Sequence, residues 1–442
     1  MIRRRIYSAA VGVGVIALTL AGCSGTTETP EETTSDAEST ASEPAESSEP
    51  AEEVVLTMWT RSVTAAQSEA MVAAFNEEYA GRINVELTVV PFAEYLQKVS
   101  AAAAGKNLPD ILAGNVIDGP NYAQLGLWTD LTDRIAGLDY ADTLAPAHIA
   151  AATVDGSVYA VPHVVDASAL YYNKVLFERA GLDPEDPPTT LAEVAEYSAA
   201  IAALGDGVGG LYLPGDCGGC LAFTVFPSIW ADGGTVMNED GTAGTLDSPE
   251  AAAVLDIYHQ MWVDGSMMPE SRNETGATQN AAFEAGTAGF ALLGSKALGT
   301  IAENDGLKIG VAPIPGVDGG TSTFVGGDIL GISSTTEQVD AAWTFLEWST
   351  SEQVQLDIYA QAGFMPVRTD LADNEYAAAD PRVVLFNTLV EDGQTPYSPR
   401  FFQTFNDPQG PFLSLIRGAV FENGSAGLVE ANQAVTDSLA KN

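Results

Sequence analysis

Residues 54–59 read VVLTMW, residues 64–81 read TAAQSEAMVAAFNEEYAG, and residues 83–91 read INVELTVVP. The first stretch is an unbroken apolar run that is typical of a buried strand, and the third alternates as a strand does. Between them, apolar side chains recur at helical spacing up to a closing glycine. A second helical stretch at 93–105 and a strand that begins at residue 109 follow. This alternation predicts an α/β fold with a parallel sheet and right-handed crossovers.

The rest of the chain continues this alternation. Thr190 and Glu193 form a capping box, which predicts a helix that ends near Gly205. Two late helices are predicted at roughly 337–350 and 352–362. The 442 residues are enough for two domains with separate cores, and one large α/β domain is the alternative. Since ligands of open α/β sheets bind beyond the carboxyl ends of the strands, two such lobes would hold a ligand in the crevice between them.

The N-terminus has the pattern of an export signal. Three arginines at positions 3–5 precede an apolar stretch from Ala9 to Leu20. That stretch is too short to span a bilayer, which needs ~20 apolar residues, and it has the length of a signal core. The segment ends in Leu-Ala-Gly-Cys at residues 20–23, which resembles the lipobox of bacterial lipoproteins. We therefore expect a signal peptide at 1–22 and lipidation of Cys23, with an ordinary secretory signal or a twin-arginine signal as the alternatives.

A polar segment separates this signal from the folded body. Residues 24–53 contain ten acidic residues, no basic residue, no aromatic residue and no Leu, Ile, Val or Met. Such a composition cannot offset the entropy of ordering, so a disordered, lipid-anchored linker is expected over 23–53. The linker would hold the body at the extracytoplasmic face of the cell membrane, attached only through its lipid.

Charge and motifs exclude several functions. The chain carries 18 basic and 60 acidic residues, a net charge of −42, and such a surface repels the phosphates of nucleic acids and anionic lipids. The sequence contains no G-x-S-x-G elbow, no H-E-x-x-H motif and no phosphate-binding loop. Because 60 acidic residues make close carboxylate pairs inevitable, such pairs do not by themselves indicate a glycoside hydrolase. We expect a protein that is not an enzyme and that needs no cofactor or metal.

Several segments together resemble the sugar-binding branch of the extracellular solute-binding proteins of ABC importers. Residues 155–162 (DGSVYAVP) with 169–174 (ALYYNK) are similar to that family's G-x-x-Y-G-V-P and L-x-Y-N-K signature, with Ala160 in place of a glycine. Further similar segments lie, in the family's order, at 109–111 with 126–131, at 282–290, at 326–327 with 341–346, and at 363–368. The resemblance covers about residues 54–430.

The resemblance implies a two-lobe periplasmic-binding-protein-like (type II) fold with hinge crossovers. One lobe would comprise 54–166 with 314–360, and the other 167–313 with 361–442. The lobes would close around a ligand by hinge motion, and ABC permease subunits would recognise the closed form. We expect a monomer that captures a carbohydrate, with a glycerol phosphate ester, a peptide or, as a third reading, hydrolysis of a glycoside as the alternatives.

A neutral sugar needs aromatic faces for its C–H groups and charged or amide partners for its hydroxyls. Residues of these types occur in loops at the carboxyl ends of predicted strands, at the predicted lobe crossings and at positions that resemble the family's cleft residues. Each has an ordinary alternative: a core aromatic, a turn or a solvated loop residue. The candidates are Thr60, Arg61, Asn115, Asp118, His163, Asp166, Trp230, Gly326, Gly327, Asp328 and Arg400.

Cys217 and Cys220 form a Cys-Gly-Gly-Cys motif. Outside the cytoplasm a disulfide is the default, and a loop this short adds only roughly 2 kcal/mol through loop entropy. A redox-active pair is the alternative, although the thioredoxin-like βαβ setting is missing. A zinc site is disfavoured because the three histidines are scattered and no second cysteine pair exists.

Overall fold

A computed structural model describes residues 52–391 and 393–441. The predicted signal peptide, Cys23 and all but the last two residues of the predicted linker lie outside these ranges. Eight strands of the described chain form one mixed sheet in the order β2-β1-β3-β12-β6-β8-β7, with β9 paired to β6. The sheet strands are β1 (Val54–Arg61), β2 (Ile83–Val90), β3 (Ile111–Asn115), β6 (Ala160–Asn173), β7 (Gly209–Tyr212), β8 (Ala288–Gly294), β9 (Ile309–Ala312) and β12 (Val325–Ile332).

Helices cover the sheet, and two short strand pairs lie outside it. The short pairs are β4 (Thr153–Val154) with β5 (Ser157–Val158), and β10 (Ile314–Pro315) with β11 (Thr321–Ser322). The helices are α1 (Ala65–Glu78), α2 (Phe92–Gly105), α3 (Gly119–Gln124), α4 (Thr132–Ala136), α5 (Pro146–Ala152), α6 (Lys174–Ala180), α7 (Leu191–Ala202), α8 (Gly218–Ala231), α9 (Pro249–Val263), α10 (Ala281–Glu284), α11 (Ala297–Thr300), α12 (Val339–Ser349), α13 (Glu352–Val354), α14 (Glu375–Ala378), α15 (Pro381–Glu391), α16 (Pro411–Gly418) and α17 (Leu428–Leu439). None of these helices is long and apolar enough to cross a membrane.

The N-terminal alternation is confirmed. β1 pairs in parallel with β2 from Val54 opposite Ile83, and also with β3, where Met58 lies opposite Ile111. The capping box at Thr190 opens α7. The prediction of one helix over 352–362 is wrong in detail, because α13 passes into a π-helical turn (Gln355–Tyr359) and a 3₁₀ turn (Ala360–Ala362). At this break the buried side-chain amide of Gln355 donates to the Ser349 carbonyl and accepts from the Val367 N–H.

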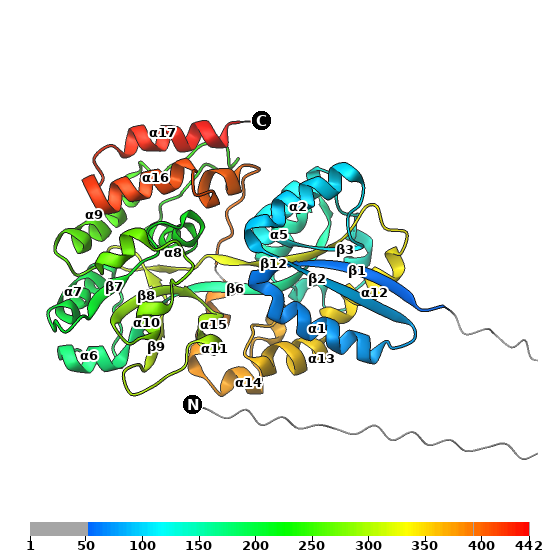
Figure 1. Ribbon diagram of the computed structural model, residues 1–442, viewed down its shortest axis with the longest axis horizontal. Coiled ribbons are helices and arrows are strands. Elements are labelled where there is room, and N and C mark those ends of the chain that lie inside the picture. The colour runs from blue at the N-terminus through cyan, green and yellow to red at the C-terminus, as the bar shows by residue number, and fades with distance from the viewer. Residues whose placement is uncertain (1–51, 392, 442) are drawn as a thin grey trace, which may run out of the picture. The chain divides into compact units, whose positions relative to one another are not determined.

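Two long strands carry the chain between the two halves of the sheet, β1–β3 on one side and β7–β9 on the other (Figure 1). Every residue of β6 is buried. Its first half pairs with β12, and its second half pairs with β8 and β9. β12 pairs with β3 along its other edge, and its register against β6 shifts at Asp328. β6 therefore pairs with strands of both halves, and β12 joins it to β3. The lobe boundaries given above stay a prediction.

Candidate ligand-binding site

A cavity of about 380 Å³ lies beside the antiparallel pair β6 and β12, the region called the crossing below because the chain passes there between the two halves of the sheet. Its wall is formed partly where parallel strands end: Arg61 closes β1, Phe92 follows β2 and Asn115 closes β3. From the other half of the sheet comes Gly294, the last residue of β8. The cavity thus lies at strand carboxyl ends, the usual ligand position in open α/β sheets.

The cavity wall combines aromatic rings with polar side chains. Its aromatic residues are Phe92, Phe223, Phe324 and Phe401. Its polar residues outside the cysteines are Arg61, Asn115, Asp166, Thr224, Gln279, Asn280, Lys296, Thr300 and Asn406. A few converging polar groups on a largely apolar wall are what a small-molecule site requires for orientation and affinity.

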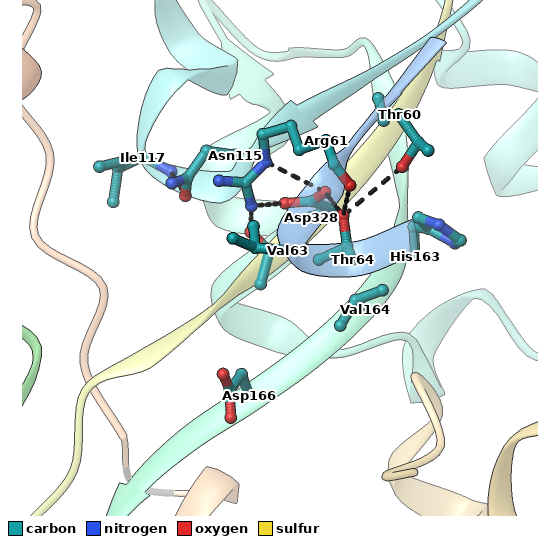
Figure 2. A network of polar contacts seen from close by, with 12 residues as sticks. Thr60, Arg61, Val63, Thr64, Asn115, Ile117, His163, Val164, Asp166 and Asp328 are labelled. Carbon is teal, nitrogen blue, oxygen red and sulfur yellow. Dashed lines mark hydrogen bonds and ion pairs between the residues drawn. The ribbon is translucent and has the colours of Figure 1, made fainter. Parts of the chain in front are cut away.

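Arg61 is anchored by a buried carboxylate (Figure 2). Its Nε donates to Asp328 Oδ2 at 3.2 Å, and its Nη2 donates to Asp328 Oδ1. Thr64 donates its hydroxyl to the same carboxylate at 2.6 Å. Asp328 has no exposed surface. The two charges compensate each other in a desolvated place, and this pairing holds the guanidinium at the cavity wall.

Asp118 ends the 3₁₀ turn that follows β3, is half-buried and is not part of the cavity lining. Burial raises the pKa of its carboxyl to about 6, although the charge of Arg61 acts in the opposite direction. Burial is also the largest influence on Arg61, whose pKa it lowers, while Asp118 counteracts that effect. Asp118 therefore tunes the electrostatic surroundings of Arg61 from outside the cavity wall.

A second ion pair joins Asp166 of β6 to Lys296, which follows β8. Lys296 Nζ is 3.2 Å from Asp166 Oδ2, and Ser295 donates its hydroxyl to Asp166 Oδ1 at 2.7 Å. Lys296 also donates to the carbonyl of Val63 at 3.4 Å, so it reaches from the end of β8 to the segment after β1. Both cations of the cavity wall are thus matched by carboxylates.

His163 lies in the core beneath the crossing. Its Nε2 is hydrogen-bonded to Ser68 Oγ at 2.8 Å, and its Nδ1 to the Tyr359 hydroxyl at 2.9 Å. Burial above all, then the charges of Arg61 and His148, lowers the pKa of His163 to about 3. Burial likewise lowers the pKa of His148 to about 4, against a hydrogen bond to the Val164 carbonyl that raises it. Both histidines are neutral structural groups at neutral pH.

These pKa values predict acid destabilisation. In the unfolded chain a histidine has a pKa of about 6.5. In the folded chain His148 is protonated only near about pH 4 and His163 only near about pH 3, so below about pH 6.5 the unfolded chain binds more protons than the folded chain. The contribution of these two histidines to the free energy of unfolding is fully present above about pH 6.5. It falls as the pH drops below that value, by at most about 1.4 kcal/mol per pH unit for each histidine. His163→Gln should flatten this slope by that amount, as measured by urea unfolding between about pH 6 and about pH 4.5. A measurement at about pH 8 gives the packing cost of the substitution alone, and identical slopes in both proteins would contradict the assignment.

Five of the predicted site residues line the cavity: Arg61, Asn115, Asp166, Gly326 and Gly327. The other six lie outside the lining. Thr60, His163 and Asp328 are buried in the polar network behind it, where Thr60 is hydrogen-bonded to Ser68 at 2.8 Å. The lining also omits Asp118 and Arg400. The buried Nε of Arg400 has no hydrogen-bond partner among residues 52–391 and 393–441.

Trp230 is a core residue one layer behind the cavity. It is 8% exposed, and its ring packs 5.8 Å from the rings of both Phe226 and Phe324. Phe324 lies between it and the cavity side, because only Phe324 of this pair lines the cavity. The aromatic rings in the cavity lining are those of phenylalanines, and a ligand contact by Trp230 stays a prediction.

The sequence held signals for part of what was missed. Phe92 follows the carboxyl end of the second strand as Arg61 ends the first, so the same reasoning applies to it. Phe401 is the neighbour of the candidate Arg400. Gln279 and Asn280 lie just before the family-like segment at 282–290, but neither belongs to it or to a strand end, so the sequence did not single them out.

Cys217 and Cys220 are joined by a disulfide. Both cysteines and the intervening Gly219 belong to the cavity lining. The bond lies in the first turn of α8, where Cys217 is the N-cap residue.

A mixed sheet crossed by two shared strands, with a cavity at the strand ends, defines a two-lobed binding protein of the periplasmic type. The chain belongs to the family of bacterial extracellular solute-binding proteins, whose model matches residues 70–384. It is 24% identical over 416 residues to the diacetylchitobiose-binding protein of Streptomyces coelicolor, and the match covers 92% of each chain. The members of this family are solute-binding proteins, and the protein is accordingly a binding protein and not an enzyme.

Solved structures agree with this assignment. The cyclic α-maltosyl-1,6-maltose-binding protein of Arthrobacter globiformis is 26% identical, with a TM-score of 0.74 over 88% of this chain and 100% of that chain. UgpB of Mycobacterium tuberculosis, solved with glycerophosphocholine, has the same fold, with 21% identity and a TM-score of 0.71 over 87% of this chain and 97% of that chain.

Proposed function

We propose that the protein captures a neutral carbohydrate, specifically an oligosaccharide, in this cavity and delivers it to the permease of an ABC importer. The observation that carries the proposal is the composition of the wall. Four phenylalanine rings line the cavity together with side-chain amide and hydroxyl groups. The two cations of the lining, Arg61 and Lys296, are each paired with a carboxylate. Aromatic rings suit the C–H faces of sugars, and the polar groups suit their hydroxyls.

The roles of the lining residues follow from their contacts. Nε and Nη2 of Arg61 are engaged by Asp328 and Gly327, and within the described chain Nη1 makes no hydrogen bond, so it is free to donate to a sugar hydroxyl. Asn115 and Asp166 would supply further polar contacts. Gly326 and Gly327 let the ligand approach the strand backbone closely.

A glycerol phosphate ester is the second candidate. UgpB of Brucella melitensis, an sn-glycerol-3-phosphate-binding protein, is 25% identical over 224 residues. An anion would need a cation that is not already neutralised, and the pairing of both lining cations argues against it.

A thermal-shift screen of the full chain tests the choice. Maltotriose, diacetylchitobiose, monosaccharides, sn-glycerol-3-phosphate and glycerophosphocholine are compared at equal concentrations. A ligand at one hundred times its Kd stabilises the folded state by about 2.7 kcal/mol, a readily measured rise in Tm. We expect stabilisation by a neutral oligosaccharide, recovered unchanged afterwards. Stabilisation by the phosphate esters alone would overturn the carbohydrate proposal.

Phe223→Ala should weaken oligosaccharide binding at least tenfold, about 1.4 kcal/mol, measured by isothermal titration calorimetry. Phe223 is half-buried, lines the cavity and packs 5.3 Å from the Phe324 ring, so its removal takes away apolar contact surface for the sugar. Trp262→Ala is the matched control, because Trp262 is also half-buried but packs on Phe421 outside the lining. Equal affinity losses in both variants would remove Phe223 from the binding surface.

We also propose that the protein acts as a monomer tethered through a lipid on Cys23. The support is the signal pattern at 1–23 and the polar linker that follows it. Cys23→Ser should move the protein from the membrane fraction to the soluble extracytoplasmic fraction, because a body with this charge has no other attraction to anionic lipid. Retention of the variant on the membrane would refute the anchor.

A further inference from the structure

The Cys217–Cys220 disulfide lies where three segments of the cavity wall meet. The first is the start of α8, where the Cys220 N–H donates to Cys217 Sγ at 3.2 Å. From this helix Phe223 and Thr224 continue the lining. The other two segments are a loop at 274–280 and a π-helical turn, η8 (Phe402–Asn406).

The loop at 274–280 packs directly against the two sulfur atoms. Gly276 has φ +88°, and a Cβ on it would lie 2.7 Å from Cys220 Sγ and 2.9 Å from Cys217 Sγ. The backbone therefore contacts the disulfide at a distance that leaves no room for a side chain. A few residues farther along the same loop, Gln279 and Asn280 line the cavity.

A buried carboxylate holds the other side of this loop. Glu274 accepts hydrogen bonds from the N–H groups of Gly276 and Thr278, both at 2.9 Å, and from the Tyr212 hydroxyl at 2.8 Å. The loop is thus held between Glu274 and the disulfide. Asn280, at the end of this held loop, lines the cavity, and its buried Oδ1 has no hydrogen-bond partner within residues 52–391 and 393–441.

The glycines between the cysteines bring the third segment close. A Cβ on Gly218 would lie 2.3 Å from the Phe405 carbonyl oxygen, and one on Gly219 would lie 3.0 Å from Asn406 Oδ1. Asn406 is itself a lining residue. The Cys-Gly-Gly-Cys sequence is therefore compact enough for both neighbouring segments to pack on it.

We propose that this disulfide is a positioning element of the binding site, and that its reduction by a dithiol lowers ligand affinity without unfolding the protein. In that step the dithiol attacks and breaks the S–S bond, gives its two electrons and two protons to form two thiols, and becomes a cyclic disulfide. Two unbonded sulfur atoms must move apart, and because Gly276 packs on both of them, the loop that carries Gln279 and Asn280 moves too. The proposal rests on the proposed function for its ligand.

The test measures affinity and local order in the full chain. Titration calorimetry with maltotriose and diacetylchitobiose compares the oxidised protein, the protein in dithiothreitol, and Cys217→Ser/Cys220→Ser. We expect at least tenfold weaker binding for the reduced protein and the double variant, with no further effect of dithiothreitol on the latter. Far-ultraviolet circular dichroism should be the same for all three, which shows that the fold is retained.

Amide hydrogen exchange provides a readout that does not need a ligand. Reduction should speed exchange at residues 276–280 at least tenfold and leave the amides of β6 and α7 unchanged. If neither sugar binds any form, the proposed function fails, but the exchange result still decides on the disulfide. Unchanged exchange at 276–280 after complete reduction, or equal sugar affinity of the oxidised and reduced proteins, would overturn this proposal.

Discussion

Asp328→Ala should lower the free energy of unfolding by about 3–5 kcal/mol, the cost of leaving a buried charge without its partner. Arg61 is 5% exposed and has two of its nitrogens on the Asp328 carboxylate. Thr64 also loses its acceptor in this variant. Denaturant unfolding of the full chain measures the effect, and sugar titration should show a parallel loss of affinity because Arg61 loses its orientation at the cavity wall.

An exposed ion pair is the matched control for this variant. Arg134 pairs with Asp340, whose side chain is 92% exposed, so Asp340→Ala should cost no more than about 1 kcal/mol. A second comparison replaces both buried charges at once. Arg61→Met/Asp328→Leu should recover much of the stability lost in Asp328→Ala, since no unpaired charge remains. A small loss in Asp328→Ala, similar to that of Asp340→Ala, would show that the Arg61 charge is solvated.

Gly327→Ala should destabilise the protein by about 2–6 kcal/mol, the sum of backbone strain and overpacking. Gly327 has φ +118°, a conformation that L-residues rarely adopt. A Cβ there would lie 1.8 Å from the Val164 carbonyl oxygen of the partner strand. Since that oxygen belongs to the backbone of β6, the clash can be relieved only by moving one crossing strand away from the other. Thermal and denaturant unfolding measure the loss.

Gly326→Ala is the matched control for Gly327→Ala, because it should affect ligand binding more than the free energy of unfolding. A Cβ on Gly326 would meet the Phe223 ring at 3.1 Å, and the nearest backbone atom would be 3.9 Å away. A ring can turn aside, so Gly326→Ala should cost less than about 1.5 kcal/mol of stability while narrowing the cavity and weakening binding. If the two variants unfold at the same denaturant concentration, the close approach of β6 and β12 at Gly327 is not a constraint on the fold.

The class of fold was predictable because it depends on local patterns. The apolar run at 54–59 and the alternation at 83–91 became β1 and β2, paired in parallel as expected. The capping box at Thr190 opened its helix. These signals work because strand and helix periodicity are read within a few residues. At 352–362 the local pattern did not reveal the change from α-helix to a π-helical and a 3₁₀ turn, where the buried Gln355 is hydrogen-bonded to Ser349 and Val367.

The candidate site was predictable where it follows from topology. Arg61 and Asn115 line the cavity as ends of parallel strands, and Asp166 and the two glycines line it as parts of the crossing. Trp230 shows the limit of this reasoning. Its aromatic character fits either a binding surface or a core, and only the rings of Phe226 and Phe324 around it determine that it packs in the core.

The sequence by itself determined the α/β class, the candidate strand ends and local features such as helix caps, since each is encoded within a few neighbouring residues. The tertiary structure alone decided which polar groups face the cavity and which compensate each other behind it. Arg61 and Asp328 are 267 positions apart, and Asp166 and Lys296 are 130 apart, yet each pair is in contact. Whether a charge is available to a ligand depends on its partner, and the sheet sets that partner: β12 brings Asp328 to Arg61 at the end of β1, and the pairing of β6 with β8 brings Asp166 to Lys296.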